Sequence, residues 1–114
     1  MKHVMRLNDE PFRMIKSGRK TIELRLYDEK RRLIAVGDEI EFVHADDATE
    51  KLYCRVAALH RFSSFAELYD NLPLLQCGYT ESDISTASAA DMDQYYPKEK
   101  QALFGVLGIE IALE

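Results

Sequence analysis

Four polar residues in the N-terminal part of the chain carry side chains that can bind an anion or a nucleobase. The segment Gly18–Arg32 reads GRKTIELRLYDEKRR. Within six positions it contains two cationic side chains, one hydroxyl and one carboxylate: Lys20, Arg25, Thr21 and Glu23. Lysine and arginine donate hydrogen bonds to phosphate or carbonyl oxygens, and glutamate accepts from an amino group or orients a neighbouring arginine. We therefore treat this segment as a candidate ligand-binding site.

An alternating pattern positions these four residues. Apolar and polar residues alternate over 20–27, which predicts a strand with Ile22, Leu24 and Leu26 facing the core. The opposite face then carries Thr21, Glu23, Arg25 and Tyr27. Two interpretations of the Glu23–Arg25 pair remain open. It is either an exposed ion pair worth about 0–1 kcal/mol or a fixed carboxylate that orients an arginine for a ligand.

Lys20 falls in phase with the apolar residues, although an unpaired lysine is rarely buried. At the start of the strand, beside the expected Gly18 turn, its stem can line the rim of the fold with the ammonium group at a cleft. That position suits a phosphate or carbonyl contact. It equally suits a side chain that simply extends into water.

A second cluster, Asp93–Lys100 (DQYYPKEK), places Tyr95 and Tyr96 before a proline and Lys98 after it. Aromatic stacking surface beside positive charge is typical of sites for single-stranded nucleic acid. The alternative is that a tyrosine packs in the core where a helix ends. We expect one of the two tyrosines to be a core residue.

Other kinds of site find little support. The three histidines are scattered without metal-ligand spacing, and phosphate-binding loops and zinc-protease motifs are absent. The acidic run Asp46, Asp47 and Glu50 is typical of a solvated loop. The sequence therefore predicts neither a metal nor a cofactor.

The charge distribution is uneven. The net charge is −5, which argues against a nucleic-acid partner, yet residues 1–32 carry +5 and residues 33–114 carry −10. A local basic region can steer an anionic ligand whatever the global sign. RNA, a nucleotide or a nucleoside is therefore a possible ligand, and a basic protein is a possible partner for the acidic part.

Length and composition indicate one globular domain, residues 1–114. Hydrophobic residues make up 46% and charged residues 31% of the 114. No apolar run is long enough to span a membrane, and the N-terminus lacks the apolar segment of a secretion signal. Two cysteines, Cys54 and Cys77, fit a reducing compartment. We expect a cytoplasmic protein with no membrane partner.

The pattern along the chain predicts an α+β fold. Strands are expected at 2–7, 20–27, 38–44, 51–62 and 105–113, and helical segments at 8–18, 63–73, 79–97 and 98–103. Short connections between the middle strands favour antiparallel pairing. We expect a small, mostly antiparallel β-barrel with helices packed on its side and mouth.

Two separated motifs resemble the ASCH domain family of the PUA-like superfamily. The first places Gly18, Lys20, Glu23 and Arg25 on a strand and then Gly37, Asp38, Ile40 and Phe42 after a charged loop. The second is YYPKEKQALFGVLGIEI, a Tyr-Pro segment followed by a final strand. The resemblance covers nearly the whole chain.

The resemblance implies a PUA-like β-barrel whose cleft, between barrel and helices, is lined by Lys20, Glu23 and Arg25. It implies RNA binding, linked to translation or RNA processing. Some relatives instead hydrolyse acetylated cytidine nucleosides with a lysine, a threonine nucleophile and a glutamate. Here the lysine is Lys20, but Glu23 stands at the threonine position, and Thr21 has the wrong strand phase for that pattern. The downstream glutamate has only the candidates Glu67 and Glu81.

The resemblance leaves two functions open. In an RNA- or nucleotide-binding module, Lys20 and Arg25 contact a phosphate or a base edge and Tyr95 or Tyr96 stacks on a base. In a small hydrolase of a modified nucleoside such as N4-acetylcytidine, Glu23 is the general base and Lys20 stabilises the oxyanion.

Overall fold

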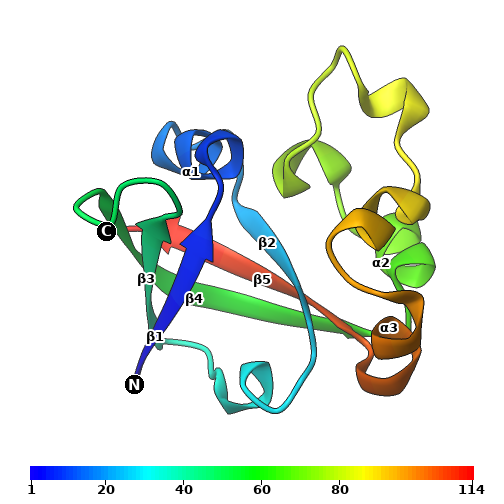
Figure 1. The fold of residues 1–114 in the computed structure, drawn as a ribbon, viewed down its shortest axis with the longest axis horizontal. Coiled ribbons are helices and arrows are strands. Elements are labelled where there is room, and N and C mark those ends of the chain that lie inside the picture. Colours follow the sequence, from blue (N-terminus) through cyan, green and yellow to red (C-terminus); the bar gives the residue numbers. More distant parts are fainter.

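The protein folds around one five-stranded sheet that curves into a half-barrel (Figure 1). The computed structural model describes residues 1–114. Its strands are β1 (Lys2–Leu7), β2 (Ile22–Leu26), β3 (Glu39–His44), β4 (Lys51–Phe62) and β5 (Val106–Leu113). Their order in the sheet is β1-β3-β4-β5-β2, so β1 and β2 are its two edges.

The prediction of mostly antiparallel strand pairing is confirmed, but one pair of strands is parallel. The β3/β4, β4/β5 and β2/β5 pairs are antiparallel, whereas β1 and β3 run parallel. No backbone ladder joins β1 to β2, so the sheet is an open half-barrel rather than a closed barrel. The β4/β5 pair has a register shift between Val56 and Ala58, and such a bulge increases local bending and twist.

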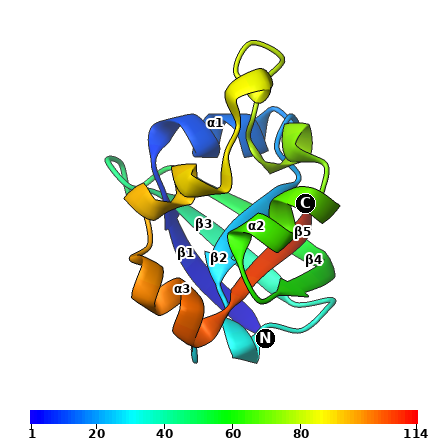
Figure 2. The same cartoon turned by 90° about the vertical axis from the view of Figure 1, so that its right-hand side faces the viewer.

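Helices lie at one end and along one side of the half-barrel. Helix α1 (Asp9–Lys16) covers the end, as Figure 1 shows. Residues 65–104, here called the helical layer, contain α2 (Phe65–Asn71), α3 (Lys98–Phe104) and the 3₁₀ helices η2 (Leu74–Cys77), η3 (Ile84–Thr86) and η4 (Ala89–Gln94). Figure 2 shows this layer in front of β2 and β5. A further 3₁₀ helix, η1 (Arg31–Leu33), lies between β2 and β3.

The expected polar helix over 79–97 is wrong, because this segment forms turns and the 3₁₀ helices η3 and η4. Its short polar side chains bond to nearby backbone instead of leaving it free to form a continuous helix. Asp83 Oδ1 accepts from the Thr80 backbone N–H at 2.6 Å. Ser88 and Asp91 then form a capping box that starts η4 anew.

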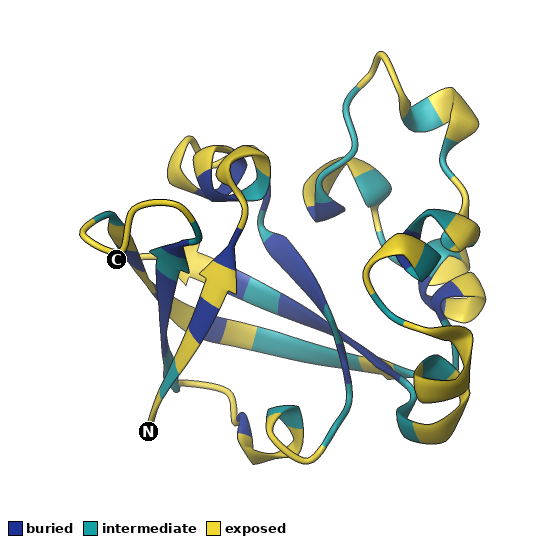
Figure 3. Ribbon diagram, in the orientation of Figure 1, coloured by how far each residue is buried: buried dark blue, intermediate teal, exposed yellow.

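Two apolar clusters flank the sheet. A cluster of 13 buried residues, the inner core, fills the half-barrel and includes Phe12, Phe42 and Ile109. A second cluster of eight lies between the sheet and the helical layer and includes Phe65 and Leu68. Strand β2 lies at the border between them, and Figure 3 shows it buried along most of its length.

This arrangement corrects the expected orientation of β2. The residues Ile22, Leu24 and Leu26 are buried as predicted, but they pack in the second cluster, against the helical layer, and not in the half-barrel. Glu23 lies opposite Ile109 and Arg25 opposite Leu107 in the β2/β5 ladder. Paired residues share a face, so both polar side chains point to the side of the inner core. Periodicity separates the two faces of a strand but does not identify which one faces which core.

Candidate functional site

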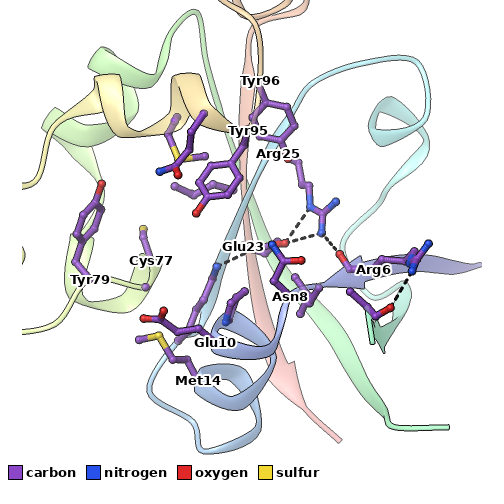
Figure 4. A pocket seen from close by; sticks show the side chains of 18 of the residues that line it. Arg6, Asn8, Glu10, Met14, Glu23, Arg25, Cys77, Tyr79, Tyr95 and Tyr96 are labelled. Carbon is purple, nitrogen blue, oxygen red and sulfur yellow. Dashed lines mark hydrogen bonds and ion pairs between the residues drawn. The ribbon is translucent and has the colours of Figure 1, made fainter. Parts of the chain in front are cut away.

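A pocket of about 720 Å³ opens where β1, α1, β2 and the helical layer meet. We call it the main pocket. Figure 4 shows its walls: Arg6 and Asn8 at the end of β1, Glu10 and Met14 on α1, Glu23 and Arg25 on β2, and Cys77, Tyr79, Tyr95 and Tyr96 in the helical layer. The pocket therefore lies beside the open edge of the half-barrel.

Glu23 forms the centre of an ion cluster in this pocket, which we call the buried triad: Lys20, Glu23 and Arg25. One carboxylate oxygen of Glu23 lies 2.8 Å from Lys20 Nζ. The other lies 2.8 Å from Arg25 Nη2 and accepts from Arg25 Nε at 2.9 Å. Glu23 is 4% exposed and Lys20 is 9% exposed. The side chain of Arg25 is 13% exposed. The Glu23–Arg25 pair is therefore largely buried, which excludes its interpretation as an exposed surface ion pair.

Electrostatics keep Glu23 ionised. Burial by itself raises the pKa of the Glu23 carboxyl, but Lys20 and Arg25 outweigh burial and hold that pKa at about 2. Burial likewise lowers the pKa of Arg25, and Glu23 reverses the shift and raises it. A carboxylate with so low a pKa, and with both oxygens occupied, is a weak general base near pH 7. Its arrangement suits orienting the two cations.

Lys20 reaches this cluster because it lies outside the strand. The prediction that the strand begins at Lys20 is wrong, since β2 begins at Ile22. The backbone N–H of Lys20 donates instead to the Met14 carbonyl of α1. Its side chain passes beneath Gly78, where an added Cβ would lie 3.5 Å from Lys20 Cδ. The alternation that assigned Lys20 to the face opposite Glu23 therefore does not apply.

Arg25 also connects the two edge strands of the sheet. Its Nη2 donates to the Arg6 carbonyl on β1 at 2.9 Å, and Figure 4 shows this bond beside the bonds to Glu23. The guanidinium thus bridges the gap that the backbone ladder leaves open, while its orientation is fixed from two sides. Sequence reasoning missed this bond, because it depends on the parallel placement of β1.

The two neighbouring tyrosines have different environments. Tyr96 is half-buried and stacks on Phe65, with ring centroids 6.1 Å apart and an interplanar angle of 19°. Tyr95 is 58% exposed and lines the main pocket. Of the two, Tyr96 is therefore the one that packs into the second cluster, and Tyr95 offers a free aromatic face.

The remaining predicted site residues lie outside the pocket lining. The side chain of Lys98 is 80% exposed at the start of α3, with Nζ 3.7 Å from Asp93 Oδ2. Thr21 donates its hydroxyl to Gln76 Oε1 at 3.2 Å and its backbone N–H to the Gln76 carbonyl. Thr21 thus ties the segment before β2 to η2, behind the wall of the pocket.

The hydrolase candidates Glu67 and Glu81 also lie outside the pocket lining. Glu67, in the first turn of α2, accepts from the Ser63 hydroxyl at 2.9 Å. No group of three or more His, Cys, Asp or Glu residues is arranged to hold a metal ion. No helix is both long and apolar enough to cross a membrane.

Three polar residues of the helical layer form a hydrogen-bonded cluster, and of these Tyr69 and Asp91 were not predicted as site residues: Tyr69, Tyr79 and Asp91. The hydroxyls of Tyr69 and Tyr79 are 2.7 Å apart, and Tyr79 donates to Asp91 at 2.7 Å. Burial raises the pKa of Tyr79, and the hydrogen bond from Tyr79 lowers the pKa of Asp91. The Ser-x-x-Asp spacing of residues 88–91 could have identified Asp91 as part of a helix N-terminal capping box. No periodic pattern in the sequence indicates that Asp91 and Tyr69 lie close together.

The charged groups that line the main pocket balance. Three are cations and three are carboxylates: Arg6, Lys20, Arg25, Glu10, Glu23 and Asp83. The lining residues within 1–32 contribute +1 and Asp83 offsets it, so the basic excess of residues 1–32 does not extend into the pocket lining. Such a lining suits an uncharged group with polar edges better than several phosphates.

Comparisons with known proteins give consistent results. A family model described as ASCH domain matches residues 5–114. The crystal structure of hypothetical protein PH0355 is 33% identical, with 100% of each chain covered and a TM-score of 0.81. The solution NMR structure of protein PF0455 from Pyrococcus furiosus is 34% identical, covers 99% of this chain and 97% of its own, and has a TM-score of 0.75.

A more distant structure shares the fold. The crystal structure of ASCH from Zymomonas mobilis is 15% identical, with a TM-score of 0.68, and the match covers 97% of this chain and 66% of that one. No curated protein matches the chain.

Proposed function

The chain belongs to the ASCH domain family, and we propose that it is a non-enzymatic RNA- or nucleotide-binding module that takes one base into the main pocket. The family is generally thought to bind RNA. Single-stranded RNA is recognised chiefly through unstacked bases that lie on aromatic rings and form hydrogen bonds at their edges.

The observation that carries the proposal is the exposed Tyr95 ring beside the donors of the buried triad. Tyr95 is 58% exposed in a pocket that also contains Lys20 and Arg25. Stacking of a base on an aromatic side chain is worth about 1–3 kcal/mol. The remaining N–H groups of Lys20 and Arg25 can then donate to a base carbonyl, because Glu23 holds both cations in place.

Phosphate contacts belong at the rim in this proposal. The balanced pocket lining disfavours a cluster of phosphates inside, whereas the exposed Arg6 at the mouth and Lys98 on α3 can contact the backbone of a bound strand. With so few contacts, affinity depends weakly on salt, since log K falls by about 0.7 per phosphate contact and tenfold rise in salt on single strands.

The hydrolase alternative with Glu23 as general base is not favoured. The pKa of Glu23 is about 2, and both of its oxygens already accept hydrogen bonds. Incubation of the protein with N4-acetylcytidine, followed by product analysis, tests this point. Turnover of N4-acetylcytidine by the wild type would contradict the non-enzymatic part of the proposal.

Fluorescence anisotropy with labelled single-stranded RNA, at low and at physiological salt, tests the proposal. Tyr95→Ala is expected to weaken binding about tenfold or more, which corresponds to the loss of one stacked base. Tyr53→Ala is the matched control, because Tyr53 is 42% exposed on β4 and outside the pocket. No binding at low salt, or an equal loss in both variants, would overturn the proposal.

Tyr95 is preferred to the triad residues for this test. Alanine at Lys20 or Arg25 leaves a buried carboxylate partly unpaired, and breaking a buried ion pair typically costs about 3–5 kcal/mol of stability. A loss of binding in those variants would therefore not be separable from a loss of folding.

A further inference from the structure

Two tyrosines in one wall of the main pocket are hydrogen-bonded to each other and to an aspartate outside the pocket lining, and we call these three residues the tyrosine wall: Tyr69, Tyr79 and Asp91. Both tyrosines line the pocket, and their rings meet edge to face with centroids 5.8 Å apart. Their hydroxyls are 2.7 Å apart, and that of Tyr79 is also 2.7 Å from Asp91 Oδ2.

The direction of the hydrogen bonds in this wall is determined. Asp91 Oδ2 also accepts the Ser88 backbone N–H at 3.1 Å, so this oxygen acts as an acceptor. Tyr79 therefore donates its hydroxyl hydrogen to Asp91, and because a phenol has only one such hydrogen, Tyr79 cannot also donate to Tyr69. Tyr69 must then donate its own hydrogen to Tyr79. Both phenol oxygens are left with lone pairs only.

The tyrosine wall thus offers acceptors to a ligand, whereas the buried triad offers donors. Lys20 and Arg25 carry N–H groups and no acceptor. Asp83, a further lining residue of the helical layer, adds a carboxylate acceptor. Figure 4 shows Tyr79 on one side of the pocket and Arg25 on the other. The ligand therefore meets an accepting wall and a donating wall.

We propose that the tyrosine wall makes the pocket selective for bases that carry both an exocyclic amino group and a carbonyl on the Watson–Crick edge. The amino group donates to the free lone pair of Tyr69, and the carbonyl accepts from Lys20 or Arg25. Guanine and cytosine have this pattern. Uracil and hypoxanthine place a carbonyl or a bare C–H where the wall requires a donor. This inference rests on the proposed function, since it assumes that a base enters the pocket.

Matched nucleotide pairs test the selectivity. GMP and IMP differ only in the exocyclic amino group, whereas CMP and UMP differ in an amino or carbonyl group at one edge position and in whether the adjacent ring nitrogen carries a hydrogen. Isothermal titration calorimetry is expected to show GMP and CMP binding about tenfold or more tightly than IMP and UMP, because a site built to accept a hydrogen bond rejects a ligand that cannot donate it. Equal affinities within each pair would overturn the inference.

Two phenylalanine variants assign the selectivity to the wall. Tyr69→Phe keeps the ring and removes the free acceptor, so both preferences should fall at least severalfold. Tyr79→Phe removes the acceptor for the Tyr69 hydrogen, which can then be donated to a ligand carbonyl, so the preference should fall or reverse towards UMP and IMP. Tyr53→Phe on β4 is the matched control and should leave the preferences unchanged. Unchanged preferences in both wall variants would overturn the inference.

The outcomes separate this inference from the proposed function. If neither single-stranded RNA nor any of the four nucleotides binds, both fail. If all four nucleotides bind equally well, and binding still depends on Tyr95, the proposed function stands and the selectivity of the tyrosine wall is wrong. Thermal unfolding of each variant shows whether it is folded in the titration.

Discussion

At the scale of the residue, Glu23 explains how two cations stay in place at the edge of an apolar core. Each of its oxygens lies 2.8 Å from a nitrogen, one of Lys20 and one of Arg25. An isolated buried charge is strongly unfavourable, but a paired and hydrogen-bonded one is tolerated. The triad therefore keeps a net positive charge of one unit in the pocket with fixed donor directions.

Because Glu23 is ionised in the folded protein, the free energy of unfolding is expected to depend on pH in the acidic range. The pKa of Glu23 falls from its ordinary 4.5 to about 2 in the folded protein. A lowered folded-state pKa means that the stabilisation is complete above pH 4.5 and is lost as the pH falls towards 2. The size of this effect is on the order of 3 kcal/mol.

Urea unfolding of the wild type and Glu23→Gln between pH 7 and pH 2 measures this effect. Glu23→Gln is expected to be less stable at neutral pH by about 3–5 kcal/mol, because Lys20 and Arg25 lose their counter-charge. The difference should shrink as the pH falls from 4.5 to 2. Parallel stability curves for the two proteins would show that Glu23 titrates normally.

At the scale of the element, the edge strands β1 and β2 are joined by a side chain instead of a ladder. The Arg25 guanidinium spans from Glu23 on β2 to the Arg6 carbonyl on β1. Only arginine has a planar fork that can serve both acceptors at once, whereas lysine is a point donor. Arg25 therefore supplies a side-chain link across the opening of the half-barrel beside the pocket.

Arg25→Lys tests this connection. The charge is kept, but one of the two acceptors is expected to lose its donor, at a cost of about 1.5–3 kcal/mol for a hydrogen bond to a charged group. Hydrogen exchange of the β1 and β2 backbone amides should accelerate. Arg55→Lys is the control, since Arg55 is exposed on β4 and its guanidinium also donates to a backbone carbonyl, that of Gly37. Equal acceleration in both variants would contradict the account.

The strands with strong alternation could be predicted from the sequence. The expected strands at 2–7 and 51–62 coincide with β1 and β4. The parallel pairing of β1 with β3 could not be predicted, because α1 and β2 separate the two strands in the chain. The residue pattern of a strand also does not indicate which other strand it pairs with. The 3₁₀ segments of the helical layer were missed since local side-chain bonds at Thr80 and Ser88 override helix formation.

The site was only partly predictable for the same reason. The polar residues of β2 could be singled out by type and spacing, but their burial depends on the helical layer, which is distant in sequence. Lys20 was assigned to the wrong face because the strand begins two residues later than its pattern indicates. The tyrosine wall joins residues 69, 79 and 91, which only the turns of the helical layer bring together.

At the scale of the whole molecule, the sheet and the helical layer each supply one side of the main pocket, which is the proposed binding site. The sheet and α1 position the donors, and the helical layer supplies the exposed Tyr95 and the accepting tyrosine wall. The net charge of −5 is compatible with the proposed RNA binding, in which base contacts in a balanced pocket are expected to carry most of the affinity and the rim to make few phosphate contacts.

The most direct test of the central claim is an NMR titration of the ¹⁵N-labelled protein with a short single-stranded RNA. Chemical-shift changes are expected to concentrate on the residues around the main pocket: Lys20, Glu23, Arg25, Gly78, Tyr79 and Tyr95. The outer face of β4 around Tyr53 should remain unchanged. Shifts that fall on β4 while the pocket residues stay unperturbed would contradict the claim that the main pocket receives the base.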